Sequence, residues 1–348
     1  MRYLTLQDRR NRQVLADIVR TYIETGEPVS SRAISKRYEE PLSTATIRSV
    51  MADLEDGGYL YQPHTSAGRV PTAAAYRFFA QEIASQATLS VEDKEWIHRE
   101  MASVTTPAEI TERAGHVLAE VSRGLGIVVS PPLRKAVLEH ARMWLIPDGR
   151  VVVVLISPGG NTRDKVLRPS RLFTQGELDA TADFLNRQYI GWTLEAIRAD
   201  LLQKLANERE RYETLAHSAL TLCDPAILGD RPQSQIYVEG AARIATAPEF
   251  ADQAQLGELL AAIEEKQRLI TVLNSCIETP EPVFVQIGVK EISQSGEHIA
   301  LISAPYSAHD KSQGSLGVLG PTRMHYERAM AAVAYVAQLF SEALSKIE

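Results

Sequence analysis

The sequence predicts an α+β protein with more than one domain, and three observations lead to this fold class. Apolar side chains recur at helical spacing in three stretches up to residue 56, and two short strand patterns follow. Apolar, β-branched runs typical of strands occupy parts of residues 126–167 and 283–319. A helical block over about residues 174–222 separates these two sets of strands. The 348 residues suffice for two or three domains with cores of their own.

The N-terminal stretch predicts three helices, the last two joined by a tight turn. Residues 7–25 carry a strong apolar stripe that stops at Gly26. Ser30 or Ser31 caps a second, shorter helix, and Pro41 lies in the turn before the third helix. This arrangement is a helix-turn-helix.

The third helix is expected to present one face to a core and the opposite face to a partner. Ser43 is a good N-cap, and an apolar stripe follows it. At about 100° per residue, the side chains that point away from the core are Ala45, Ser49, Ala52 and Asp56, with Thr46, Arg48 and Asp53 on the flanks. Small, hydroxyl and basic residues come first and acids last, which suits a helix whose first turns enter the DNA major groove. An ordinary amphipathic surface helix is the alternative for this segment alone.

Two short strands around a polar loop are predicted directly behind the third helix. Gly57 and Gly58 end the helix, and residues 60–62 can form a strand. Residues 64–68 form the loop tip, from which the chain returns through Arg69. This hairpin adds a wing to the helix-turn-helix.

The wing brings a histidine, two hydroxyls and an arginine close together. Catalysis by His64 with Thr65 or Ser66 would need an orienting acid and an oxyanion site, and the sequence offers no comparable frame. The favoured interpretation is that the hydroxyls and the Gly68 amide bind phosphate, while Arg69 enters or flanks a minor groove. The alternative is that His64 and Thr65 only hold the shape of the loop.

The remaining elements alternate between helices and strands. In chain order we expect a helix over residues 72–84, a domain boundary over 85–93, helices over 91–102 and 108–124, strands over 126–130, 137–146, 151–156 and 165–167, the helical block over 174–222, a strand over 235–240, a helix over 256–273, strands over 283–289, 299–303 and 315–319, and a closing helix over 322–347. The strands before the helical block are interpreted as a meander sheet. An inserted helical subdomain explains why the block lies between strands.

The charge distribution favours DNA binding by the N-terminal part, residues 1–88, which we call the head. The whole chain has 37 Lys and Arg against 44 Asp and Glu. The head has 11 Lys and Arg against 10 Asp and Glu, so it is the less acidic part. Its basic residues could form a phosphate-facing patch: Arg9, Arg10, Arg12, Arg32, Lys36, Arg37, Arg48, Arg69 and Arg77. A solvated face of mixed charge is the alternative for Arg9–Arg12. The candidate DNA-binding residues are Arg32, Ser43, Thr44, Ala45, Thr46, Arg48, Ser49, His64, Thr65, Ser66 and Arg69.

Several runs of residues resemble the bacterial heat-inducible transcription repressor family HrcA. They are Gly26-Glu27-Pro28-Val29-Ser30-Ser31-Arg32, Ala45-Thr46-Ile47-Arg48 with Met51-Ala52-Asp53-Leu54-Glu55, Pro63 to Thr72, Tyr76-Arg77-Phe78, and Gly317 to Tyr326 near the other end of the chain. The sequence departs from the family pattern at Thr44, where Pro is common, at Ser49, where Asn is common, and at Ala75, where Gly is usual. Ser49 lies on the outward face of the third helix, so this departure could change which base edge or phosphate is contacted.

The resemblance implies both an architecture and a function. The implied fold has a winged helix-turn-helix DNA-binding domain (1–88) and a GAF-like α/β domain (89–172 and 235–348), which is interrupted by an inserted, mainly helical dimerising domain (173–234). The implied function is a heat-shock repressor that binds an inverted-repeat operator upstream of chaperone genes, is released on heat stress and is kept active by the GroE chaperonin. A homodimer would match the two half-sites. Such a repressor is expected in the bacterial cytoplasm, at the nucleoid when bound to its operator.

Other function classes find less support. Cys223 and Cys276 are too few and too far apart for a disulfide framework or a cysteine-based zinc finger, and the eight histidines are scattered, so no metal or cofactor is expected. No window approaches the roughly 20 apolar residues of a membrane span. The glycine-containing stretches at residues 157–161 and 320–322 are interpreted as structural turns rather than phosphate cradles. A metabolite-responsive winged-helix regulator, with Cys276 or His298 lining a pocket in the GAF-like domain, is the alternative function. An enzyme with an accessory DNA-binding head lacks any paired acid and base.

Overall fold

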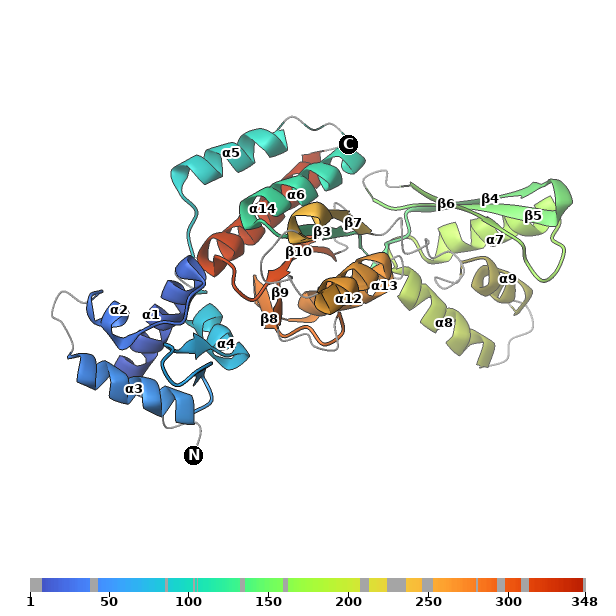
Figure 1. Cartoon of the computed structure of the whole chain (residues 1–348). Helices are drawn as coiled ribbons and strands as arrows, with labels where there is room; N and C mark the ends of the chain where they lie inside the picture. Colours follow the sequence, from blue (N-terminus) through green and yellow to red (C-terminus); the bar gives the residue numbers. More distant parts are fainter. Residues whose placement is uncertain are drawn as a thin grey trace.

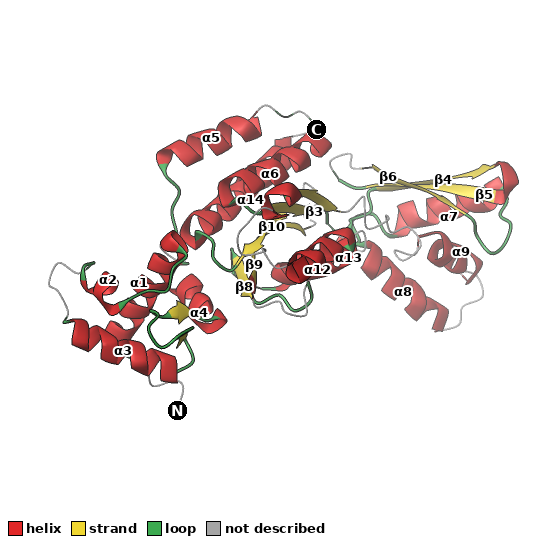
Figure 2. Cartoon of the chain, viewed as in Figure 1, coloured by secondary structure: helices red, strands yellow, loops and turns green. Residues whose placement is uncertain are grey.

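The computed structural model of the chain describes residues 8–37, 43–84, 87–102, 104, 106–131, 135–158, 162–206, 213–223, 236–245, 253–279, 281–292, 298–307 and 313–346. These residues form an α+β structure in which three groups of elements follow one another along the molecule (Figure 1). The first group is the mainly helical head. The other two groups each contain an antiparallel sheet with helices packed against it (Figure 2). We call them the central unit and the distal unit.

The head contains the three helices and the hairpin that the sequence predicts. Its elements are α1 (Arg9–Thr25), α2 (Ser31–Ser35), α3 (Thr44–Asp56), β1 (Leu60–Tyr61), β2 (Val70–Pro71) and α4 (Ala73–Ile83). Gly26 ends α1 in the left-handed region, with φ of 73°. Ser30 caps α2 by accepting a hydrogen bond from the Ala33 N–H at 3.2 Å, so the cap is Ser30 rather than Ser31. The predicted turn at Pro41 lies outside the described residues.

The central unit is built on a five-stranded sheet with the order β7-β3-β10-β9-β8. Its elements are α5 (Val91–Ala102), α6 (Pro107–Ser122), β3 (Leu125–Val129), β7 (Ile236–Glu239), α11 (Ala241–Ala245), α12 (Gln253–Glu264), α13 (Lys266–Asn274), β8 (Phe284–Ile287), β9 (Ile299–Ser307), β10 (Gln313–Pro321) and α14 (Tyr326–Lys346). Val128 and Ile302 pack into one core, which contains α6 and α14. Ile127 and Leu301 pack into another core with α13. Because helices cover both faces, these strands read as continuous apolar runs in the sequence.

The distal unit, residues 136–223, has a core of its own. It contains β4 (His140–Ile146), β5 (Arg150–Ile156) and β6 (Thr162–Leu167), which pair as a separate three-stranded sheet, and the helices α7 (Gln175–Gln188), α8 (Leu194–Ala206) and α9 (Glu213–Cys223). Buried residues of β4 and β5, such as Met143 and Val153, pack with Leu178 and Leu185 of α7 in one cluster. Figure 1 shows the helices on one side of this sheet.

The core of the distal unit extends across the predicted limit of the insertion. The sequence interpretation assigned residues 137–167 to the GAF-like domain (89–172) and began a mainly helical insertion at residue 173. The predicted limit divides a core that the structure keeps together, and the unit contains a sheet as well as helices. The individual strands are where the sequence predicts them. β4, β5 and β6 pair in chain order, as the predicted meander does, but β3 pairs with β7 and β10 instead of joining them. Pairing with β10 depends on contacts between distant residues, which periodicity does not encode.

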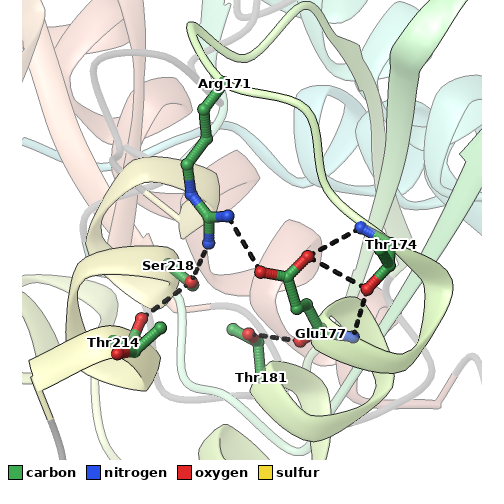
Figure 3. A network of polar contacts seen from close by, with 6 residues as sticks. All are labelled: Arg171, Thr174, Glu177, Thr181, Thr214 and Ser218. Atoms are coloured by element: carbon green, nitrogen blue, oxygen red, sulfur yellow. Dashed lines mark hydrogen bonds and ion pairs between the residues drawn. The ribbon is translucent and has the colours of Figure 1, made fainter.

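A polar network holds the start of α7 against α9 (Figure 3). Thr174 caps α7 by accepting a hydrogen bond from the Glu177 N–H, and the Glu177 carboxylate accepts one from the Thr174 N–H at 2.8 Å. Arg171 donates to the Glu177 carboxylate and to the Ser218 hydroxyl, both at 2.9 Å. The hydrogen bond from the Thr174 backbone, together with that from Arg171, lowers the pKa of Glu177 to about 2.

Within the described ranges, no helix combines the length and the hydropathy that a membrane span requires.

Candidate nucleic-acid interface

The outward face of α3 is exposed as its sequence predicts. Ile47 and Leu54 are fully buried on the inner side of the helix. The residues of the first two turns that stand exposed are Ser43, Thr44, Ala45, Arg48 and Ser49. Asp53 and Asp56 are exposed at the other end of the helix. The face therefore presents small, hydroxyl and basic side chains at its N-terminal end and carboxylates at its C-terminal end.

The N-terminus of α3 is held by a side-chain cap. The Ser43 hydroxyl accepts a hydrogen bond from the Thr46 N–H at 3.0 Å and lies 2.8 Å from the Thr46 hydroxyl. Thr46 is half-buried. These two candidates thus fix the start of the helix, and the remaining free amides of the first turn are directed outward along its axis.

Two exposed arginines, one on α2 and one on α3, have no ion-pair partner among the residues that the structure describes. Arg32 is exposed on α2, and Arg48 is exposed on α3. Neither forms a salt bridge with a described residue.

Other basic residues of the predicted patch are engaged within the head. Arg12 pairs with Glu82 at 2.6 Å, and Arg37 pairs with Glu24. Such exposed pairs contribute about 0–1 kcal/mol and open easily. In the folded chain they nevertheless reduce the net positive charge around α1, so the basic surface is narrower than the sequence count suggests.

The wing tip is exposed, and its shape is held by a residue that the sequence interpretation missed. His64, Thr65 and Ser66 are exposed. The Gln62 side-chain amide donates to the carbonyls of Thr65 at 3.0 Å and of Ala67 at 2.9 Å. Gln62 therefore stabilises the loop and leaves the three candidate side chains exposed around it. An amide just before a polar loop tip is a signal that could have been used.

The base of the wing lies directly against the turn between α1 and α2. The backbone groups of Val29 and Arg69 exchange two hydrogen bonds, at 2.8 and 2.9 Å. A Cβ at position 68 would lie 2.5 Å from the carbonyl oxygens of Pro28 and Val29, so this close approach requires Gly68. The Arg69 guanidinium bonds the Glu55 carboxylate at 2.8 Å, and only 20% of the Arg69 side chain is exposed. The predicted minor-groove contact by Arg69 would require this ion pair to open.

The residues that the sequence offers for other ligands, Cys276, His298 and the stretch 320–322, lie outside the head. Cys276 is fully buried, which raises the pKa of its thiol, whereas His298 is exposed and lines a cleft of about 760 Å³ between the head and the central unit. The Thr322 N–H donates to the His298 carbonyl at 2.9 Å, which supports the structural interpretation of residues 320–322. Across the described ranges, no three His, Cys, Asp or Glu residues come together as a possible metal site. Residues 159–161 lie outside those ranges.

The chain is similar to known transcription repressors. The family model "HrcA protein C terminal domain" matches residues 108–330. The heat-inducible transcription repressor HrcA of Geobacter sulfurreducens is 34% identical over 336 residues, covering 96% of this chain and 97% of that protein. The protein of the same name from Thermodesulfovibrio yellowstonii is 34% identical over 349 residues, covering 98% and 99%. A crystal structure of a hypothetical protein aligns over 98% of this chain and 99% of its own, with 22% identity and a TM-score of 0.62, which shows a shared fold.

Proposed function

The chain belongs to the HrcA family of heat-inducible transcription repressors, and from this membership we propose that it binds an inverted-repeat operator as a homodimer. Each head is a winged helix-turn-helix that reads one half-site, and the central unit is the GAF-like domain. The operator lies upstream of chaperone genes. Heat stress releases the repressor, and the GroE chaperonin maintains its active form.

The observation that carries this proposal is the polarity of the exposed face of α3. Its 13 residues span about 20 Å, while the major groove is about 12 Å wide, so only part of the helix can enter. Ala45 and Thr44 allow close approach, and Arg48 and Ser49 reach the base edges. Asp53 and Asp56 stay outside the groove, where phosphate repulsion is smaller.

The wing supplies contacts to the DNA backbone in this proposal. His64, Thr65 and Ser66 meet phosphates, since hydroxyl and imidazole donors on an exposed loop suit such contacts. Arg69 supports the interface indirectly, because its ion pair with Glu55 joins the wing to α3. Arg32 adds a phosphate contact from α2.

The open face of the distal sheet supports a homodimer formed through this unit. Trp144 lies opposite Val152, and Val152 lies opposite Val166, so the three residues form a row across the sheet. Trp144 is 44% exposed and Val166 is 49% exposed. Further exposed apolar residues of the same unit are Leu145, Leu172, Ile190, Trp192 and Leu202. Exposed apolar side chains on an open sheet face are typical of interaction sites, and an isologous dimer would cover the row of Trp144, Val152 and Val166.

The proposed heat response follows from marginal stability. If the DNA-competent dimer is only about 5 kcal/mol more stable than inactive forms, modest heating depletes it. A chaperonin that refolds the inactive chain would then make repression depend on spare folding capacity.

Operator binding before and after mild heating, with and without chaperonin, tests this proposal at fixed salt. Binding should fade on heating and recover with chaperonin. Operator binding that changes with neither treatment would contradict the proposed switch. Thermal stabilisation of the protein by a member of a metabolite panel would favour the ligand-responsive alternative.

A further inference from the structure

The motif around the start of α14 lies at the junction between the head and the central unit, and the function proposed above does not use it. We propose that Arg323, Tyr326 and Glu327 are positioning residues, which hold the head at one orientation and thereby set the half-site spacing that the dimer accepts. This inference rests on the proposed reading of an inverted repeat.

The first contact joins Arg323 to the end of α1. A Cβ built on Gly26 would lie 3.1 Å from the Cζ of Arg323 and closer still to one of its terminal nitrogens. The guanidinium therefore lies directly over the Gly26 backbone. Two features require glycine at position 26. Its φ is positive, at 73°, and the absence of a side chain leaves room for the guanidinium.

The second contact places Tyr326 against α4. Its side chain is buried, with its ring centroid 6.1 Å from that of Tyr76 and 6.3 Å from that of Phe79. The Tyr326 hydroxyl donates to the Thr322 carbonyl at 2.7 Å, so its polar end is satisfied within the motif. The ring packs against the Tyr76 and Phe79 rings and so acts as an apolar anchor for the head. One hydrophobic core accordingly runs from α1 and α4 into α14.

The third contact joins α1 to the start of α14. Arg20 of α1 bonds the Glu327 carboxylate at 2.8 Å, and its guanidinium lies 5.7 Å from the centre of the Phe79 ring. Arg77 of α4 reaches the Ile287 carbonyl at 3.4 Å. Polar contacts from two helices of the head thus meet two segments of the central unit, and contacts at separate points define an orientation.

A cleft of about 760 Å³ lies beside these contacts. It is lined by residues of the head and of the central unit, among them Tyr22, Gly26, Tyr61, His298, Thr322 and Arg323. The head therefore has space to move on this side once the three contacts are weakened. A change of orientation alters the distance and the angle between the two recognition helices of a dimer.

A pair of glycine variants separates this role from a loss of stability. Gly26→Ala introduces a side chain at positive φ, and the new methyl group collides with the Arg323 guanidinium. Gly58→Ala introduces one at φ of 78° in the same head, but a Cβ there would meet nothing within 4 Å. Both variants carry the same kind of backbone strain, and only the first disturbs the junction. Arg323→Ala is the third variant, with exposed Arg187→Ala on α7 as its control.

The experiment measures the affinity of each full-length dimer for duplexes whose half-sites are moved apart by single base pairs, each about 3.4 Å. The unchanged protein, Gly58→Ala and Arg187→Ala should share one sharp optimum. Gly26→Ala and Arg323→Ala should shift it or reduce the preference for the best spacing about ten-fold, while their affinity for an isolated half-site stays unchanged. Folded variants that keep the original optimum would overturn this inference alone. If the unchanged protein has no spacing optimum, both the inference and the proposed function are overturned.

Discussion

Replacing Gly68 with alanine is predicted to destabilise the head by about 1–3 kcal/mol. A Cβ at this position would lie 2.5 Å from three backbone atoms of Pro28 and Val29, none of which can turn aside as a flexible side chain could. The wing must then move away from the turn between α1 and α2. This movement breaks the two backbone hydrogen bonds between Val29 and Arg69, each worth about 0.5–1.5 kcal/mol.

Amide hydrogen exchange is the appropriate assay, because a chain with several cores need not unfold in one step. The Val29 and Arg69 amides should exchange faster in Gly68→Ala. The matched control is Gly257→Ala in α12, where a Cβ would meet nothing within 4 Å and helix propensity should stabilise by about 0.5–1 kcal/mol. Unchanged protection of both amides in Gly68→Ala would refute the close-approach argument.

Three further predictions concern the DNA contacts, the dimer and the distal unit. Arg48→Ala and Ser49→Ala should each lose about 1–3 kcal/mol of discrimination between operator and random duplex; equal losses on both duplexes would contradict base contacts. Trp144→Asp should yield monomers in analytical ultracentrifugation, because it puts a charge in the apolar row of Trp144, Val152 and Val166, and an unchanged dimer would exclude that row from the interface. Glu177→Gln should lower thermal stability above about pH 4.5. Since folding lowers the pKa of Glu177 to about 2, its contribution is lost as the pH falls from 4.5 towards 2, and the two melting curves should converge there; a difference independent of pH would contradict this linkage.

The sequence predicted those features of the candidate interface that depend on local geometry. The burial of Ile47 and Leu54 and the exposure of Arg48 and Ser49 follow from the period of one helix, which the chain encodes within 13 residues. The cap at Ser43 is equally local.

Contacts between residues that are distant in the sequence lie beyond what the sequence pattern predicts. The ion pair of Arg69 with Glu55 depends on how the wing folds back on α3, so an arginine expected at the DNA has a partner inside the head. Met143 and Val153 carry a strand pattern whichever sheet they join, and only the packing against α7 reveals that they belong to the distal unit. The contact of Arg323 with Gly26 joins segments almost 300 residues apart, which no local pattern anticipates.

The central claim is that two heads read two half-sites, and binding isotherms with stoichiometry on three duplexes test it most directly. One duplex carries both half-sites, one has a single half-site scrambled, and one has both scrambled, all at the same salt concentration. Two chains should bind the intact operator, and affinity should fall strongly when one half-site is scrambled. When both half-sites are scrambled, only salt-sensitive residual binding should remain. Equal affinity for the three duplexes, or one chain bound to the intact operator, would contradict the central claim.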